Sequence, residues 1–141
     1  MSTPAKEQTV RELLALCEEY ALSGTDFLHT LSIEEMCAAY NGIGPESFHP
    51  TLRKAVDHLA PDLRPIALIH DVRFTYGDGS REWFDYANDE LEANGLSLAN
   101  QKYRWYNPMR YITRVRVRTY AALCRNFGWE AYLRACNHQA S

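Results

Sequence analysis

The sequence predicts an all-α fold, a compact bundle of five to seven helices. Apolar residues recur at intervals of three and four along most of the chain, whereas the strict alternation of apolar and polar residues that indicates strands is rare. A capping residue followed by a first-turn proline, as at Thr3-Pro4 and Asn107-Pro108, marks helix starts. No repeat, low-complexity tract or change in composition marks a boundary, so we expect a single domain, 1–141.

The N-terminal part predicts two helices. The first begins at Pro4, and its apolar stripe continues until Gly24 ends the run. The second begins after Ser32, where the spacing to Glu35 is that of a capping box. This second helix is expected to end where a glycine-containing loop, 40–44, begins.

The central part predicts three more helices. A proline opens each of the helices expected at 50–60 and 65–74. Ser80 caps the next helix, and Asn94-Gly95 is its expected C-terminal stop. The glycine-rich residues 76–79 predict a turn between these helices, or alternatively the tip of a small hairpin.

The C-terminal part, 107–135, predicts the longest helix and a short final one. The longest helix follows the Asn107 cap and ends near Phe127-Gly128. The final helix is expected at 129–135.

Composition sets broad limits on the function. The hydrophobic content of 46%, the charged content of 23% and the formal charge of −3 are ordinary for a globular protein and give no general attraction to nucleic acid. No apolar run approaches the roughly 20 residues that span a bilayer. The polar N-terminus has no secretory apolar region, so we expect a cytoplasmic chain as synthesised, with virion association as a further possibility.

The four cysteines predict free, mostly buried thiols. They are scattered and form no C-x-x-C pair, which argues against a zinc site, and no export signal supports disulfides. They are Cys17, Cys37, Cys124 and Cys136.

The dipeptide His70-Asp71, inside an apolar helical run, predicts a hydrolytic site. A neutral histidine is a good general base near pH 7, and it works best when a carboxylate holds its other ring nitrogen. Asp71 points about 100° away from His70 on a helix, so the orienting carboxylate should come from the next helix. Asp85 and Asp89 stand four residues apart on that helix, and either could reach across to His70. Asn88 is an alternative, neutral partner for His70.

Asp71 is then free to bind a hard cation. Calcium takes carboxylate and carbonyl oxygens in flexible geometry. The loop Tyr40-Asn41-Gly42-Ile43-Gly44 predicts such carbonyls, because glycine lets the backbone turn toward a ligand. The alternative interpretations are a structural His-Asp pair and an ordinary turn.

These motifs resemble those of the phospholipase A2 family. The loop fits its Y-x-G-x-G calcium loop, and residues 69–74 resemble its H-D-x-x-Y helix, most closely in the cysteine-poor viral and bacterial branch that includes the parvovirus capsid phospholipase domain. The resemblance covers residues 40–91. It implies a phospholipase A2-like core in which calcium binds the carbonyls of Tyr40, Gly42 and Gly44 together with Asp71. It also implies that His70 is the base and Asp89 its orienting partner.

A second resemblance keeps a non-catalytic alternative open. Small phage-encoded proteins of unassigned function also carry an Ala-x-x-His-Asp helix, here Ala67 to Asp71. Phe74 stands where the phospholipase family has a tyrosine, and the interval from Gly44 to His70 is longer than usual for the family. Both departures favour a phage structural or accessory protein that keeps the scaffold as an assembly module.

A basic and aromatic cluster lies at the start of the longest helix. Arg110, Arg114 and Arg118 follow one another at intervals of four, and Arg104-Trp105 comes just before them. The preferred interpretation is a solvated helix face with core-packed rings. The alternative is a contact with a phospholipid membrane surface or with other phage or virion proteins.

Overall fold

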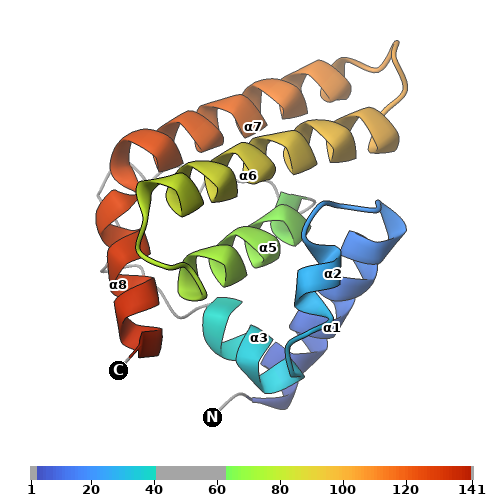
Figure 1. Ribbon diagram of the computed structural model, residues 1–141. Coiled ribbons are helices and arrows are strands. Elements are labelled where there is room, and N and C mark those ends of the chain that lie inside the picture. Colours follow the sequence, from blue (N-terminus) through green and yellow to red (C-terminus); the bar gives the residue numbers. More distant parts are fainter. Residues whose placement is uncertain (1–2, 41–62, 141) are drawn as a thin grey trace.

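The computed structural model describes residues 3–40 and 63–140, and in those ranges it is all-helical, with seven helices and no strand (Figure 1). The all-α prediction is therefore confirmed, whereas the helix expected at 50–60 lies outside the described residues. The helices are α1 (Pro4–Glu19), α2 (Thr25–Leu28), α3 (Ile33–Tyr40), α5 (Arg64–Thr75), α6 (Arg81–Lys102), α7 (Pro108–Phe127) and α8 (Trp129–Ala140).

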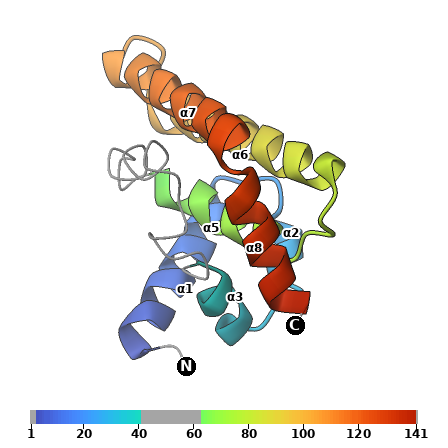
Figure 2. The same ribbon diagram turned by 90° about the vertical axis from the view of Figure 1, so that its left-hand side faces the viewer.

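The helices form a layered bundle (Figures 1 and 2). Helices α6 and α7 lie side by side as a long antiparallel hairpin, and α5 packs against α6. Helices α1, α2 and α3 pack against α5 on the side away from α7, and α8 crosses one end of the bundle, where it contacts α5 and α7. Among the described residues no helix is long and apolar enough to cross a membrane.

Most helix starts are made by the capping residues that the sequence predicts. The Thr3 side chain accepts from the amide of Lys6 at the start of α1. Ser32 and Glu35 form the reciprocal capping box before α3, with distances of 2.9 and 3.0 Å between the paired atoms. Asn107 caps α7 by accepting from the Met109 amide. These bonds satisfy amides that have no partner within the helix.

Helix α6 corrects one sequence prediction, because it continues past the expected stop at Asn94-Gly95. The Asn94 side chain is buried and holds the loop after α1, accepting from the Ser23 amide and donating to the Ser23 carbonyl at 2.8 Å each. Gly95 lies against Val117 of α7, where a Cβ would come within 2.7 Å of Val117 Cγ2. Both residues serve packing between elements, which local stop signals cannot reveal. Helix α8 is also longer than expected, and the short α2 was not predicted.

The turn between α5 and α6 is confirmed as a turn. The Asp78 carboxylate accepts from the Ser80 amide at 2.9 Å, and Ser80 caps α6 by accepting from the Trp83 amide. The Trp83 indole donates to the Arg73 carbonyl at 2.7 Å and ties the two helices together. All four cysteines are free and buried, as predicted.

The rings at the start of α7 are exposed, so the core packing preferred from the sequence is wrong. Trp105 is 73% exposed and Tyr106 is 63% exposed, and large parts of Met109 and Tyr111 also face solvent. Only a narrow stripe of α7 is buried against α6, at Thr113, Val117, Ala121 and Cys124. The rings lie before or outside that stripe.

We expect Gly95→Ala to destabilise the fold by about 1–3 kcal/mol, because the added Cβ overpacks the contact with Val117. Elsewhere in a helix the same change would stabilise by about 1 kcal/mol. In a Val117→Ala background the change should therefore become neutral or stabilising. Urea unfolding of the four proteins measures both effects, and a Gly95→Ala protein as stable as the wild type would contradict the close packing.

Candidate functional site

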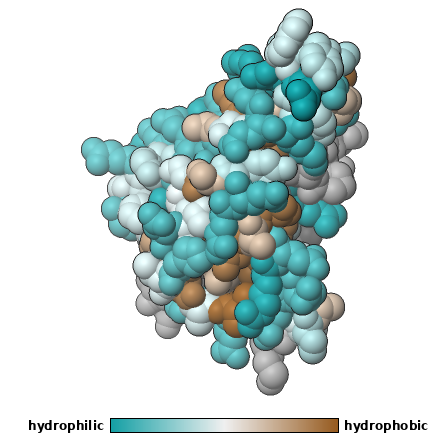
Figure 3. Space-filling model, turned by 90° about the vertical axis from the view of Figure 1, so that its right-hand side faces the viewer, coloured by the Kyte–Doolittle hydropathy of each residue, from teal (hydrophilic) through white to brown (hydrophobic). Residues whose placement is uncertain are grey.

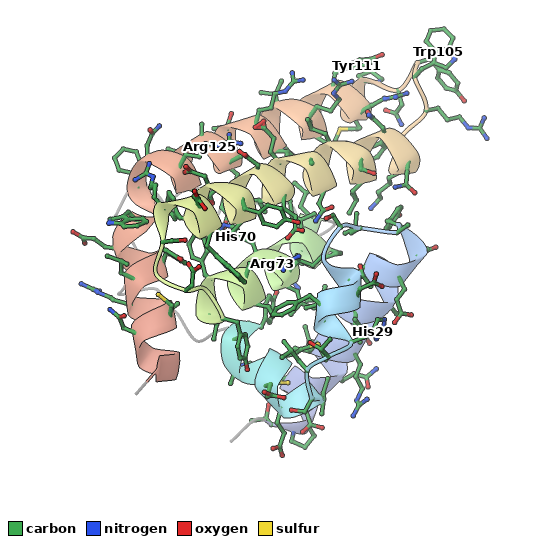
Figure 4. The ribbon with its side chains drawn as sticks, in the orientation of Figure 1. His29, His70, Arg73, Trp105, Tyr111 and Arg125 are labelled. Carbon is green, nitrogen blue, oxygen red and sulfur yellow. The ribbon has the colours of Figure 1, made fainter. Side chains whose placement is uncertain are left out.

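His70 lies on the buried face of α5 and faces α6 (Figure 4). His70 is only 5% exposed, and its Nε2 atom lies 2.8 Å from Oδ1 of Asn88, which is fully buried on α6. The Phe74 ring, one turn further along α5, lies 4.2 Å from the imidazole ring, centroid to centroid. Because an amide oxygen only accepts, this arrangement assigns the proton to Nε2 and leaves the lone pair on Nδ1.

The α5–α6 register explains why Asn88 is the partner. Phe74 and Phe84 stack across the antiparallel pair at 5.7 Å, close to the turn. His70 lies four residues before Phe74 on α5, and Asn88 lies four residues after Phe84 on α6. Both are therefore one helical turn away from the ring contact. Residues equally far from Gly79 in the turn therefore face each other.

The structure does not bring either of the expected carboxylates to His70. Asp85 is exposed and pairs with Arg81 at 3.4 Å. Asp89 is also exposed, and its Oδ1 accepts from Arg125 of α7 at 2.8 Å. Counting residues from the turn would have selected Asn88, whereas the choice of Asp85 or Asp89 rested on the chemical preference for a carboxylate.

Burial keeps the imidazole neutral. Desolvation lowers the pKa of His70 to about 4, although the Asn88 hydrogen bond and the Glu90 carboxylate both act to raise it. The Nδ2 atom of Asn88 is buried without a hydrogen-bond partner in the described part of the structure. A buried polar group without a partner costs free energy and is uncommon in native proteins.

Asp71 follows His70 on α5 and therefore points about 100° away from it around the helix axis. Burial raises the pKa of its carboxyl well above the usual range, although part of the residue remains accessible. After desolvation, the Asp71 charge contributes to the raised pKa of Tyr40, at the end of α3, and of Tyr120 on α7. Among the described residues no hydrogen bond or ion pair to the Asp71 carboxyl is recorded.

This donor set fits a hard cation in part. A desolvated carboxylate gains from binding a cation, and the Asp71 charge acts on Tyr40 at the end of α3. Gly42 and Gly44, the other expected calcium ligands, lie outside the described residues. Within 3–40 and 63–140, no group of three or more His, Cys, Asp or Glu side chains could hold a metal ion.

The predicted lipid or partner surface lies far from His70. Figure 4 places Trp105 at the tip of the α6–α7 hairpin and Tyr111 close to it, whereas His70 lies toward the opposite end of α6. Arg110 donates to Asn100 of α6 near the tip, whereas Arg114 and Arg118 follow along α7 as far as its middle. The aromatic tip and His70 therefore lie apart, and the arginine row extends between the tip and the middle of α7.

No protein-family model matches the chain, and no curated protein or solved structure matches it either. Any function assigned to the chain therefore depends on its own residues.

We expect Asn88→Leu to lower the free energy of unfolding by about 1–3 kcal/mol, because the Nε2–H group of His70 then lacks its buried acceptor. Adding His70→Phe should recover most of that loss, since replacing both partners by apolar groups removes the unmet donor. Asp89→Asn is the matched control on the same helix and should cost less than about 1 kcal/mol. A larger cost for Asp89→Asn than for Asn88→Leu would contradict the observed pairing.

Proposed function

We propose that this chain catalyses calcium-dependent hydrolysis of a glycerophospholipid acyl ester, with His70 as the general base. The observation that carries the proposal is the buried His70–Asn88 hydrogen bond between two antiparallel helices, with Asp71 on the adjoining face of α5. The resemblance of the loop 40–44 and of residues 69–74 to the phospholipase A2 family names the substrate class.

Asn88 would act on His70 by orientation. The amide oxygen accepts the Nε2 proton, so the ring is fixed with Nδ1 available to take a proton. The depressed pKa keeps the ring neutral at physiological pH, although a pKa of about 4 also makes the free imidazole a weak base. Asparagine performs this orienting role beside histidine in papain-like proteases, so a carboxylate is not chemically required.

Glu90 would supply the charge that Asn88 lacks. Its carboxylate raises the pKa of His70, which means that it favours the imidazolium formed when the base takes a proton. Glu90 pairs with Arg73 at 2.9 Å, which reduces this effect but keeps the carboxylate in place. The chain would thereby divide orientation and charge between two residues of α6.

The reaction follows from these roles. His70 would take a proton from water as the water oxygen adds to the ester carbonyl carbon, and the imidazolium would return that proton to the leaving glycerol oxygen as the ester C–O bond breaks. The products are a fatty acid and a lysophospholipid. Asp71 and the carbonyls of Tyr40, Gly42 and Gly44 would hold Ca²⁺, which supplies polarisation of the ester carbonyl.

A non-catalytic role is the second candidate, and specific observations favour it. The partner of His70 is a neutral amide, and Phe74 contacts the imidazole where the phospholipase family has a tyrosine. In this alternative the chain is a phage structural or accessory protein, and the exposed surface of α7 is its assembly contact.

Release of a dye-labelled fatty acid from anionic phospholipid vesicles tests the first candidate. The wild type should release dye with millimolar calcium and not with chelator. His70→Ala should lower the rate at least about 100-fold, because it removes the base. His29→Ala is the matched control, since His29 lies at the surface beside Glu18, and it should keep full activity. No release by folded wild-type protein would overturn hydrolysis and favour the assembly module.

Calcium titration by calorimetry tests the metal assignment separately. Asp71→Asn should abolish binding while the circular dichroism spectrum keeps its helical signal, because the carboxylate is the charged ligand. His70→Ala should still bind calcium. Unchanged binding by Asp71→Asn would remove Asp71 from the site.

A further inference from the structure

Helix α7 presents an apolar face to solvent. Val115 is 62% exposed, and Tyr111 and Ile112, one turn before it, are about half exposed. These residues lie opposite the stripe that α7 buries against α6. Exposed apolar side chains that gather on one helix face form a candidate contact surface for a partner.

Arginines flank this row on both sides. Among the described residues, Arg104, Arg114, Arg116 and Arg118 form no ion pair with a carboxylate. Residues 103–127 contain six arginines and no Asp or Glu, so all 18 acidic residues lie elsewhere in the chain. The surface is therefore strongly cationic on a chain whose formal charge is −3, and its partner should be anionic.

The hairpin tip adds two aromatic rings in a defined conformation. The Tyr111 hydroxyl donates to the Trp105 carbonyl at 2.7 Å, and the Asn107 cap holds the chain as it enters α7. The Trp105 and Tyr106 rings pack edge to face at 5.6 Å between centroids. Trp105 lies at the end of the molecule (Figure 4). In Figure 3 the upper end of the displayed face is mostly teal and pale, with few strongly hydrophobic residues.

We propose that this hairpin face, formed by Trp105, Tyr106, Tyr111, Ile112, Val115 and the flanking arginines, docks on an anionic phospholipid bilayer. Amphipathic rings partition to the level of the lipid headgroups, and each basic residue near an anionic surface adds attraction. The aliphatic Ile112 and Val115 have counterparts in acyl chains and none in a nucleic acid backbone. Arginines spread along two turns of a helix match mobile headgroups better than a single phosphate site.

This inference stands on observations separate from the His70 site. It goes beyond the proposed function, because the hairpin tip and His70 lie toward opposite ends of α6. Binding measured in chelator does not depend on turnover, so failure of docking and failure of hydrolysis give different results.

Co-sedimentation with vesicles in chelator tests the docking. We expect the wild type to bind vesicles of phosphatidylglycerol and phosphatidylcholine, to bind phosphatidylcholine vesicles much more weakly, and to lose binding as salt rises. Arg114→Gln/Arg118→Gln should lower the partition coefficient at least about tenfold. The control Arg11→Gln/Arg134→Gln removes the same charge from exposed positions on α1 and α8. It should change the partition coefficient less than about twofold.

The three tryptophans allow a spectroscopic test of the contact itself. Trp105 is largely exposed, whereas Trp83 and Trp129 are partly buried in the bundle. Anionic vesicles should therefore shift the emission of the wild type to the blue, and Trp105→Phe should abolish that shift while the partition coefficient stays within a few fold of the wild type.

Three outcomes would overturn the proposal. The first is no binding to anionic vesicles, and the second is equal loss of binding in the two double-arginine variants. The third is tighter binding to a single-stranded oligonucleotide than to vesicles, which would identify a nucleic acid partner instead.

Discussion

The buried ion pair between Glu90 and Arg73 is the interaction on which the rest of the fold depends. The Glu90 side chain is 3% exposed, and its two oxygens accept from the guanidinium at 2.9 and 3.1 Å. The same carboxylate accepts from the Ser23 hydroxyl at 2.8 Å, so α6 holds both α5 and the loop before α2. A buried charge is tolerated only when it is paired and its hydrogen bonds are met, and removal of one partner leaves the other uncompensated. Helices α5 and α6 are thereby fixed against sliding along one another.

This fixed register has a chemical consequence. It sets His70 against Asn88 and brings the Glu90 carboxylate close enough to raise the histidine pKa against the effect of burial. Asp71 is the next residue on α5, and its charge contributes, after desolvation, to the raised pKa of Tyr40 and Tyr120. One short helix therefore separates a neutral hydrogen-bonded pair from a desolvated carboxyl. That separation is what a base and a cation ligand acting on one substrate would require.

The sequence predicts the helices well and the contacts between them less well. Caps at Thr3, Ser32 and Asn107 are local, because the bonds that they make join residues two or three positions apart, and the structure contains them. Asn94-Gly95 has the chemistry of a helix stop, but its residues are used for contacts with Ser23 and Val117, which are distant in sequence. The exposure of Trp105 also depends on how far the hairpin projects beyond its neighbours. The register of α5 on α6 could have been predicted from the sequence, because the short turn fixes which residues of the two helices face each other.

The hairpin tip and the His70 site lie toward opposite ends of α6 (Figure 4). Membrane docking by the tip and chemistry at His70 therefore do not depend on contact between the two. The proposed function requires that His70 is a neutral base oriented by Asn88. The most direct measurement is the ¹⁵N NMR spectrum of the His70 imidazole at neutral pH, assigned with an Asn88→Leu variant. We expect a neutral ring with the proton on Nε2 and an unprotonated Nδ1, and a changed Nε2 signal in the variant. A proton on Nδ1, or a charged imidazolium at that pH, would contradict it.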